Sequence, residues 1–143
     1  MTDSNQKAKH TYQLIEISMT WEEAKAYCEN LGGFLATITT EEEQKFIESV
    51  LQVGSRNYYW IGGYCGSDRI FKWITGEPMT YTAWARGEPN NYLGQDKMVI
   101  YRNDNPQNMG NQYRWDDLSN FGIIPNEPFF SLDNFGFICE WNN

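Results

Sequence analysis

The run Gly87-Glu88-Pro89-Asn90-Asn91 places a carboxylate and a side-chain amide on either side of a proline, in a segment too polar to bury. Glu88 offers anionic oxygens and Asn90 a carbonyl oxygen, a mixture that Ca²⁺ accepts when about six to eight oxygens converge on it. Proline fixes one φ angle, and a cis bond before it would turn the two side chains toward the same point. The run therefore predicts a cation site, and a solvated turn is the alternative that these residues also permit.

Further oxygen ligands follow this run. Asp96 lies six residues after the first asparagine, and Asp116 and Asp117 are adjacent in the chain. We expect strands at residues 97–101 and 113–115. A hairpin formed by these strands would bring its two ends together, so that Asp96 and Asp116, twenty residues apart, could share one ion.

Length and charge limit the function. The chain has 143 residues, the size of one domain, and its 16% aromatic content is enough to fill a core. Its net charge of −8 argues against nucleic acid or an anionic membrane as partner, because both would repel it. No apolar run approaches the roughly 18 residues that span a bilayer. Residues 1–9 are polar, so we expect a disordered tail or linker before a domain over residues 10–143.

Groups suited to catalysis are scarce. Histidine occurs once, as His10 at the edge of the tail, and no Ser, Cys or Lys has a basic partner at a recognisable spacing. We therefore predict that the protein is not an enzyme.

Two helices are expected early in the chain. The run Thr20-Trp21-Glu22-Glu23 has the pattern of a capping box, and apolar residues at helical spacing after it place Cys28 on the buried stripe. Thr39 or Thr40 should cap a second helix, whose apolar stripe covers residues 46–51.

Strands are expected at both ends of the chain and after the helices. Alternating apolar residues predict a first strand at 10–17 and a last one at 136–141. Strands at 58–61 and 69–73 should pair as a hairpin. Between residues 75 and 95 the frequent Gly, Pro and Asn predict a long irregular loop, and loops of this length are usually functional.

Taken together, residues 10–143 resemble the C-type lectin-like domain. The motifs that carry the resemblance are, in chain order, Trp21-Glu22-Glu23-Ala24 with Cys28, Leu31-Gly32-Gly33, Trp60-Ile61-Gly62-Gly63, Glu88-Pro89-Asn90, Trp115-Asp116-Asp117 and Phe137-Ile138-Cys139-Glu140. The resemblance implies an α+β fold in which two helices flank antiparallel strands. It also implies paired N- and C-terminal strands and a long irregular calcium-binding loop.

The resemblance implies a Ca²⁺ site that binds sugar. The implied metal ligands are Glu88, Asn90, Asp96, Asp116 and Asp117. The first four would also hydrogen-bond the sugar, two of whose vicinal hydroxyls bind the metal directly in this family. A slip of one residue would place Gln95 at the position of Asp96. The Glu-Pro-Asn form of the loop is associated with mannose, fucose, glucose and N-acetylglucosamine rather than galactose.

The chain has three cysteines. The resemblance assigns Cys28 and Cys139 to the family's long disulfide bridge, which implies an oxidising compartment. Cys65 has no partner in the family pattern. It is either a buried small side chain or the origin of an intermolecular bond.

Three features depart from the family pattern near the loop. Met98 stands where the family commonly has a cysteine, so the disulfide that closes the loop is absent. Asp116 stands where the family usually has Asn, which keeps a metal oxygen but removes an N–H₂ donor for a sugar hydroxyl. The segment after Asp116 is unusually long, and its side chains Phe121, Phe129 and Phe130 either pack under the loop or line a ligand surface.

We therefore predict a calcium-dependent carbohydrate-binding module that recognises mannose-type or related sugars with equatorial 3,4-diols. The alternative is a non-catalytic protein-binding or structural module of the same fold that binds no sugar. Asp116 and the long segment 118–134 are the features that favour it. We expect an extracellular or cell-surface protein from which this domain is cut, with a glycan or a protein as partner and no membrane insertion.

Overall fold

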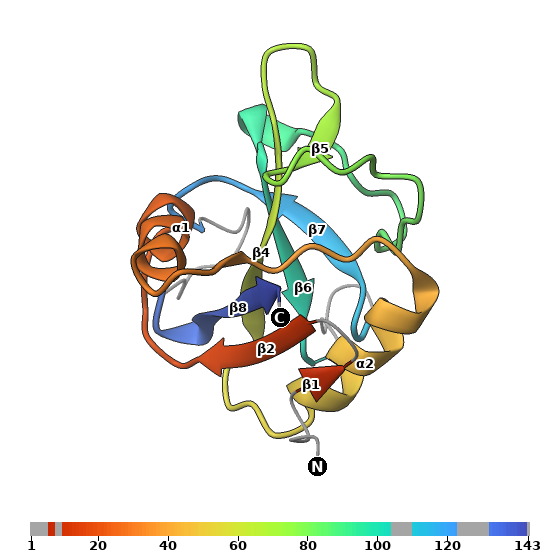
Figure 1. Cartoon of the computed structure of the whole chain (residues 1–143). Helices are drawn as coiled ribbons and strands as arrows, with labels where there is room; N and C mark the ends of the chain where they lie inside the picture. The colour runs from red at the N-terminus through yellow and green to blue at the C-terminus, as the bar shows by residue number, and fades with distance from the viewer. Residues whose placement is uncertain (1–5, 8–9, 104–109, 123–131, 143) are drawn as a thin grey trace.

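The computed structural model describes residues 6–7, 10–103, 110–122 and 132–142. Figure 1 shows two helices beside a twisted sheet, in which the strand at residues 10–15 lies beside the strand at residues 135–142. In chain order the elements are β1 (Gln6–Lys7), β2 (His10–Ile15), α1 (Trp21–Asn30), β3 (Phe34–Leu35), α2 (Glu41–Leu51), β4 (Tyr58–Cys65), β5 (Phe71–Trp73), η1 (Tyr92–Gly94), β6 (Lys97–Tyr101), β7 (Trp115–Leu118), η2 (Leu132–Asn134) and β8 (Phe135–Asn142). Neither helix has the length and apolar run needed to span a bilayer in the described part of the chain.

The described strands form one sheet. Its order is β1-β2-β8-β4-β6-β7, with β3 beside β8 and β5 beside β4. The predicted pairing of the terminal strands is confirmed, since β2 and β8 run antiparallel from the His10↔Asn142 pair to the Ile15↔Phe137 pair. Strands β4 and β8 are parallel, which departs from the expected antiparallel arrangement. The predicted α+β class with two helices is confirmed.

Strand β1 lies within the predicted tail. Gln6 pairs with Thr11 and Lys7 with His10. The backbone groups of these residues thus find hydrogen-bond partners on the neighbouring strand, so the expectation of a disordered segment over residues 1–9 is wrong for Gln6 and Lys7.

Both helices begin at predicted caps. The Thr20 hydroxyl accepts from the Glu23 backbone N–H at 3.2 Å, and the Glu23 carboxylate accepts from the Thr20 N–H at 3.0 Å, which completes the capping box of α1. Of the two candidates for α2, Thr40 is the cap, because its hydroxyl accepts from the Glu43 N–H at 3.0 Å. Each helix therefore starts where local hydrogen bonding satisfies its first free N–H groups.

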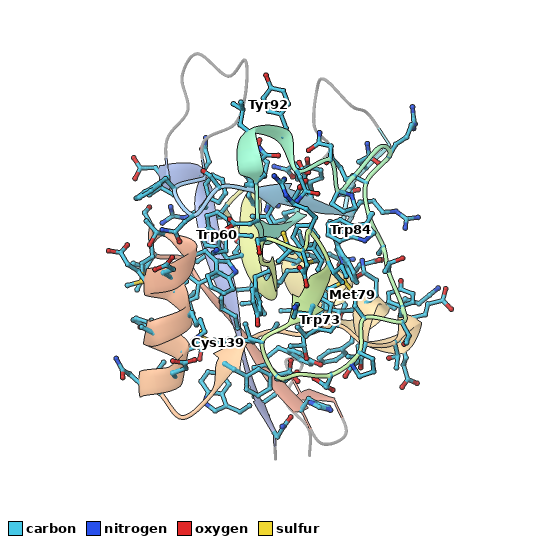
Figure 2. The ribbon with its side chains drawn as sticks, turned by 90° about the horizontal axis from the view of Figure 1, so that it is seen from above. Trp60, Trp73, Met79, Trp84, Tyr92 and Cys139 are labelled. Carbon is cyan, nitrogen blue, oxygen red and sulfur yellow. A yellow bond between two sulfur atoms is a disulfide. The ribbon has the colours of Figure 1, made fainter. Side chains whose placement is uncertain are left out.

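The two helices cover opposite sides of the sheet, as Figure 2 shows. Trp21, Ala24 and Cys28 of α1 belong to one buried cluster, whereas Ile47 and Leu51 of α2 belong to the other. The sheet thus separates two apolar layers, and each layer is covered by one of the helices.

The predicted bridge between Cys28 and Cys139 is confirmed. Their Cα atoms lie 5.6 Å apart, and the bond joins residues separated by 111 positions. The bridge therefore ties α1 to the central strand β8.

The hairpin at β4 and β5 is confirmed, although β4 is longer than expected. It continues through Gly62 and Gly63 to Cys65, and its pairing with β5 runs from Gly63↔Trp73 to Cys65↔Phe71. A Cβ atom at Gly63 would lie 1.9 Å from the sulfur of Met98. The glycine therefore provides the space that this buried methionine fills.

The strand predicted at residues 113–115 is wrong, because β7 covers Trp115–Leu118. Tyr113 has a left-handed φ of 66°, which no strand residue adopts, so the strand can only begin after it. Pairing with β6 then matches Met98 with Asp117 and Val99 with Asp116. Both aspartates consequently lie inside an edge strand rather than beyond the end of a hairpin.

Candidate metal and ligand site

The segment between β5 and β6 is irregular, as predicted, and a short bridge anchors it to β7. Trp84 and Trp115 form this bridge. The Trp115 N–H donates to the Ala83 carbonyl at 2.9 Å, and the Ala85 N–H donates to the Trp115 carbonyl at 2.8 Å. The Glu88 N–H then donates to the Ala85 carbonyl at 3.0 Å. These bonds hold the Glu-Pro-Asn turn against the strand that carries the two aspartates.

Aromatic rings pack against Trp115, one of the two residues of this bridge. Trp115 is fully buried, and its indole N–H donates to the Gln44 side chain of α2 at 2.9 Å. The rings of Trp73 and Trp84 meet the Trp115 ring edge-on at centroid distances of 5.4 and 5.8 Å. Figure 2 shows Trp73, Met79 and Trp84 on the same side of the sheet. Indole packing thus anchors this loop to the sheet.

Three of the predicted ligands converge at the Glu-Pro-Asn turn. Oxygen atoms of Glu88, Asp116 and Asp117 all lie within 4.8 Å of one another. The Glu88-Pro89 peptide bond is cis. Asp117 is fully buried, and the Oε1 atom of Glu88 is buried without a hydrogen-bond partner. The arrangement places a buried oxygen without a hydrogen-bond partner close to two further carboxyl groups.

Asn90 joins this group through its backbone. The backbone N–H groups of Asn90 and Asn91 donate to the two oxygens of Asp117 at 3.3 and 2.7 Å. The side-chain oxygen of Asn90 accepts from the Tyr92 N–H at 3.0 Å, and the residue is exposed. The side chain of Asn90 is therefore exposed, while its backbone is tied to the buried Asp117.

Asp96 lies outside the carboxylate group. Its side chain is 3.2 Å from the ammonium group of Lys97, and its backbone N–H donates to Leu118 at 3.3 Å. The strand register explains the displacement: Asp116 lies opposite Val99, so Asp96 is three residues beyond the point where Asp116 pairs. The expectation that Asp96 and Asp116 meet at the ends of one hairpin is therefore wrong.

Burial and mutual repulsion govern the charges at the site. Burial, and then the neighbouring Asp116 and Asp117, together raise the pKa of Glu88 to about 9. Burial also raises the pKa of Asp116 to about 6, although hydrogen bonds from Tyr101 and Glu88 oppose that rise. At neutral pH the metal-free site consequently retains a proton. A bound divalent cation would replace that proton and offset the repulsion among the carboxylates.

Two residues of the site were not predicted from the sequence. The Tyr101 hydroxyl donates to the Oδ2 atom of Asp116. Asn91 donates its backbone N–H to Asp117 and its side-chain N–H₂ to the Gln95 carbonyl, the latter at 3.0 Å. The repeated asparagine after Glu88-Pro89 was the only available signal for Asn91, whereas the Tyr101 contact depends on strand register.

A pocket of about 270 Å³ opens beside the loop, between the turn after β4 and η1. Its lining includes Arg69, Asn91 and Asp96 together with Cys65. Cys65 is a free buried thiol whose sulfur accepts from the Asn91 side chain at 3.6 Å. Burial raises the pKa of this thiol. The structure thus agrees with the first of the two alternatives for Cys65, a buried small side chain.

Exposed apolar side chains follow the site residues in the chain. Tyr92 and Leu93 are 48% and 85% exposed, and Figure 2 shows Tyr92 projecting away from the domain. Phe121 is 60% exposed, so the first of its two alternatives, packing under the loop, is wrong. Phe129 and Phe130 lie outside the described residues.

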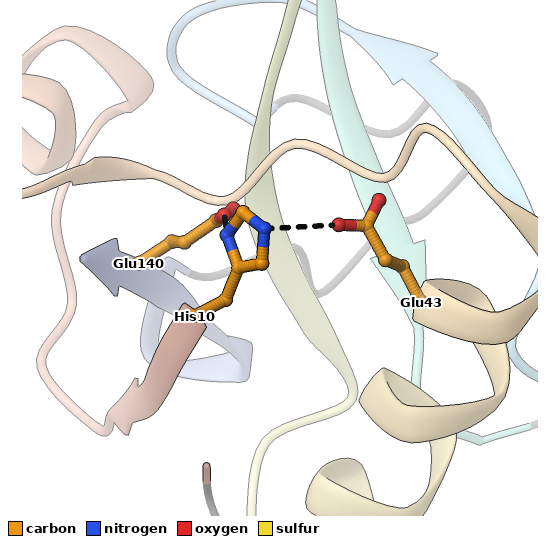
Figure 3. A group of neighbouring side chains, drawn as sticks. All are labelled: His10, Glu43 and Glu140. Atoms are coloured by element: carbon orange, nitrogen blue, oxygen red, sulfur yellow. Dashed lines mark ion pairs between the residues drawn. The ribbon is translucent and has the colours of Figure 1, made fainter. Parts of the chain in front are cut away.

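A second group of ionisable side chains joins β2, α2 and β8 (Figure 3). The two imidazole nitrogens of His10 face different carboxylates, with Nδ1 2.6 Å from Glu140 and Nε2 3.7 Å from Glu43. The second oxygen of Glu140 accepts from the Thr37 N–H at 3.0 Å. Burial is the main cause that raises the pKa of Glu140 to about 7. His10 lies between the two carboxylates, so this group joins β2, α2 and β8.

Comparison with known proteins gives a consistent result. The sequence model of the family described as "Lectin C-type domain" matches residues 17–120. Ladderlectin from Oncorhynchus mykiss is 30% identical over 111 residues, which cover 76% of this chain and 55% of ladderlectin. The chain thus spans about half the length of the curated relatives it matches first.

Two solved structures resemble the whole domain. A calcium-independent type II antifreeze protein has 26% sequence identity and a TM-score of 0.73, covering 96% of this chain and 89% of its own. The cow C-type carbohydrate-recognition domain of CD23, solved in the presence of a GlcNAc2Man3 oligosaccharide, has 25% identity and a TM-score of 0.72, covering 96% and 91%. The fold is therefore shared by an antifreeze protein and a carbohydrate-recognition domain.

Proposed function

Because the chain belongs to the lectin C-type domain family, we propose that it is a calcium-dependent carbohydrate-binding module for mannose-type sugars with equatorial 3,4-diols. The observation that carries this proposal is the convergence of Glu88, Asp116 and Asp117 at the Glu-Pro-Asn turn. In their ionised forms, three carboxylates within 4.8 Å repel one another, and a divalent cation with oxygen ligands relieves that repulsion.

The residues present fit Ca²⁺. Glu88 has a buried oxygen without a partner, and carboxylate oxygens together with an amide oxygen form a hard donor set. Glu88, Asp116 and Asp117 would hold the ion, with Asn90 beside them. Asp96 is left out of the proposed set because Lys97 already neutralises it. When bound, the ion supplies a direct bond to two vicinal sugar hydroxyls.

The protein side chains would select the sugar around that ion. Glu88 can only accept a hydrogen bond when ionised, whereas the exposed N–H₂ group of Asn90 can donate one. Two equatorial hydroxyls that lie side by side can meet one acceptor and one donor at once. Ionised Asp116 is a second acceptor, so a sugar hydroxyl must direct its proton toward it.

We further propose a non-catalytic domain of an extracellular or cell-surface protein. The disulfide between Cys28 and Cys139 is typical of an oxidising compartment. A carbohydrate-recognition domain solved with a mannose-containing oligosaccharide shares the fold at 25% identity, which supports a glycan as the partner. This proposal concerns the domain alone, because the chain spans only about half the length of the relatives it matches first.

The second candidate function is a module of the same fold that recognises a protein or another surface and binds no sugar. Asp116 favours it, because both of its oxygens already accept hydrogen bonds, from Tyr101 and from the Asp117 N–H. The similarity to a calcium-independent antifreeze protein supports it as well.

A glycan array tests the two candidates. The wild-type protein should bind mannose-type glycans in Ca²⁺ and lose them in chelator, and Glu88→Ala should abolish the signal. Glu22→Ala is the matched control, because Glu22 is an exposed glutamate on α1. If Ca²⁺ raises the melting temperature while no glycan binds, the second candidate is correct. If Ca²⁺ changes neither measurement, the metal site itself is refuted.

A further inference from the structure

Tyr101 and Asp116 form a diagonal pair across β6 and β7. Asp116 lies directly opposite Val99, and Tyr101 is two residues along the same strand as Val99. Side chains two apart on a strand share a face, so Tyr101 and Asp116 are diagonal neighbours on one face of the sheet. Their contact is the hydrogen bond from the Tyr101 hydroxyl to Oδ2 of Asp116.

The Tyr101 ring is held in place by aromatic packing. It is only 4% exposed, and Tyr58 meets it edge-on at a centroid distance of 5.7 Å. Tyr58 in turn packs against Phe135 of β8 at 4.9 Å. The hydroxyl is therefore fixed by the core of the sheet, and it does not reach the surface where a sugar would bind.

Asp116 is restrained at both oxygens. While Oδ2 accepts from Tyr101, Oδ1 accepts from the Asp117 N–H at 2.7 Å. The carboxylate has no ion pair with a lysine or arginine within the described residues, although Glu88 and Asp117 lie beside it. The tyrosine hydroxyl thus supplies a neutral donor to a carboxylate that stands among others of like charge.

We propose that Tyr101 is a positioning residue of the metal site, which fixes the Asp116 carboxylate in the orientation that Ca²⁺ requires. This inference rests on the proposed calcium-binding function. A rotating Asp116 would swing away from Asp117 because like charges repel, and the Tyr101 hydroxyl prevents that rotation at little cost. The residue acts through Asp116 and does not touch ion or sugar.

A double-mutant cycle tests the proposal on the full chain. Ca²⁺ affinity is measured by calorimetry for wild type, Tyr101→Phe, Asp116→Asn and the double variant. Tyr101→Phe keeps the ring and removes only the hydroxyl, and it should weaken Ca²⁺ binding roughly tenfold, as expected for a hydrogen bond to a charged group. In the Asp116→Asn background the same change should alter the affinity by less than about twofold.

Tyr12→Phe is the matched control. Tyr12 is also a buried tyrosine, 1% exposed, but it lies on β2, which β8, β4 and β6 separate from β7. It should leave the Ca²⁺ affinity unchanged. Melting temperatures in chelator show whether each variant is folded.

The outcomes separate this inference from the proposed function. Wild-type binding together with unchanged affinity in Tyr101→Phe overturns the positioning role alone. An equal loss in the Asp116→Asn background overturns it too, because the effect would then be general destabilisation. If wild type binds no Ca²⁺, the proposed function fails and the positioning role fails with it. A melting temperature reduced in Ca²⁺ but unchanged in chelator supports the role.

Discussion

The imidazole Nδ1 of His10 lies 2.6 Å from Oε2 of Glu140, a carboxylate that is only 1% exposed. Burial raises the pKa of Glu140 from its ordinary 4.5 to about 7. The native state therefore binds this proton more tightly than the unfolded chain does. The bound proton adds to the free energy of unfolding. This added stability is fully present below about pH 4.5 and is lost as the pH rises toward 7.

Glu140→Gln should remove that pH dependence. The amide retains the carbonyl oxygen that accepts from Thr37, but it cannot ionise. The wild-type unfolding free energy, taken relative to the variant, should fall by up to about 1.4 kcal/mol per pH unit between pH 4.5 and 7. Urea unfolding in chelator, followed by tryptophan fluorescence, measures it. Glu22→Gln is the exposed control, and parallel curves for wild type and Glu140→Gln would contradict the prediction.

Features encoded by neighbouring residues could be predicted from the sequence. The capping box at Thr20 and Glu23 needs only a hydroxyl and a carboxylate three residues apart, and the structure shows it. The start of β7 could not be predicted, because Tyr113 has a side chain typical of strands but adopts a left-handed backbone conformation. The surrounding fold, rather than local propensity, sets that conformation.

The candidate site was predicted in part for a related reason. Glu88, Asp116 and Asp117 could be named because their types suit a hard cation, and the fold brings them together. Asp96 was assigned from its position in the chain, and the register of β6 and β7 moves it away. The contact between Tyr101 and Asp116 depends on the same register. Such pairings become visible only when strand alignment is known.

Gly63 should be intolerant of any side chain. A Cβ atom there would lie 1.9 Å from the sulfur and 2.9 Å from Cγ of Met98, which is fully buried. Gly63→Ala should therefore lower the unfolding free energy by about 1 to 3 kcal/mol, the usual cost of overpacking. Urea denaturation measures the loss.

Two further variants test the cause of that loss. Gly66→Ala is the control, because its Cβ would meet nothing closer than the Asp68 side chain at 4.0 Å. Met98→Ala combined with Gly63→Ala should be less destabilised than the sum of the single changes, since the clash is gone. Simple additivity would show that Met98 is not the obstacle.

Calcium binding should release protons. In the metal-free protein the pKa of Glu88 is about 9 and that of Asp116 about 6, so Glu88 is protonated at pH 7. A cation requires the ionised forms, so the apparent affinity should rise with pH by up to about tenfold per unit between pH 6 and 9. Calorimetry at pH 7 in two buffers of different ionisation enthalpy gives the number of protons released. A value of zero would exclude Glu88 from the ligands.

Sugar selectivity should follow the donor and acceptor at the Glu-Pro-Asn turn. Glu88→Gln with Asn90→Asp exchanges the two roles while it keeps the charge of the pair unchanged. We expect the ratio of mannose to galactose affinity to fall by roughly tenfold per exchanged hydrogen bond. Calorimetry with both monosaccharides at saturating Ca²⁺ measures the ratio. An unchanged ratio with the metal still bound would show that these side chains do not select the sugar.

Replacing Asp116 provides the last test of the site, because the change should shift the affinities for Ca²⁺ and for sugar in opposite directions. Asp116→Asn removes one negative charge, so Ca²⁺ should bind somewhat more weakly. Ionised Asp116 can only accept a hydrogen bond from a sugar hydroxyl, whereas the new N–H₂ group can donate one to it. Mannose at saturating Ca²⁺ should therefore bind more tightly, by roughly tenfold. Calorimetric titration of both ligands resolves the two effects. If neither wild type nor Asp116→Asn binds any sugar while Ca²⁺ still binds, the module recognises something other than a glycan.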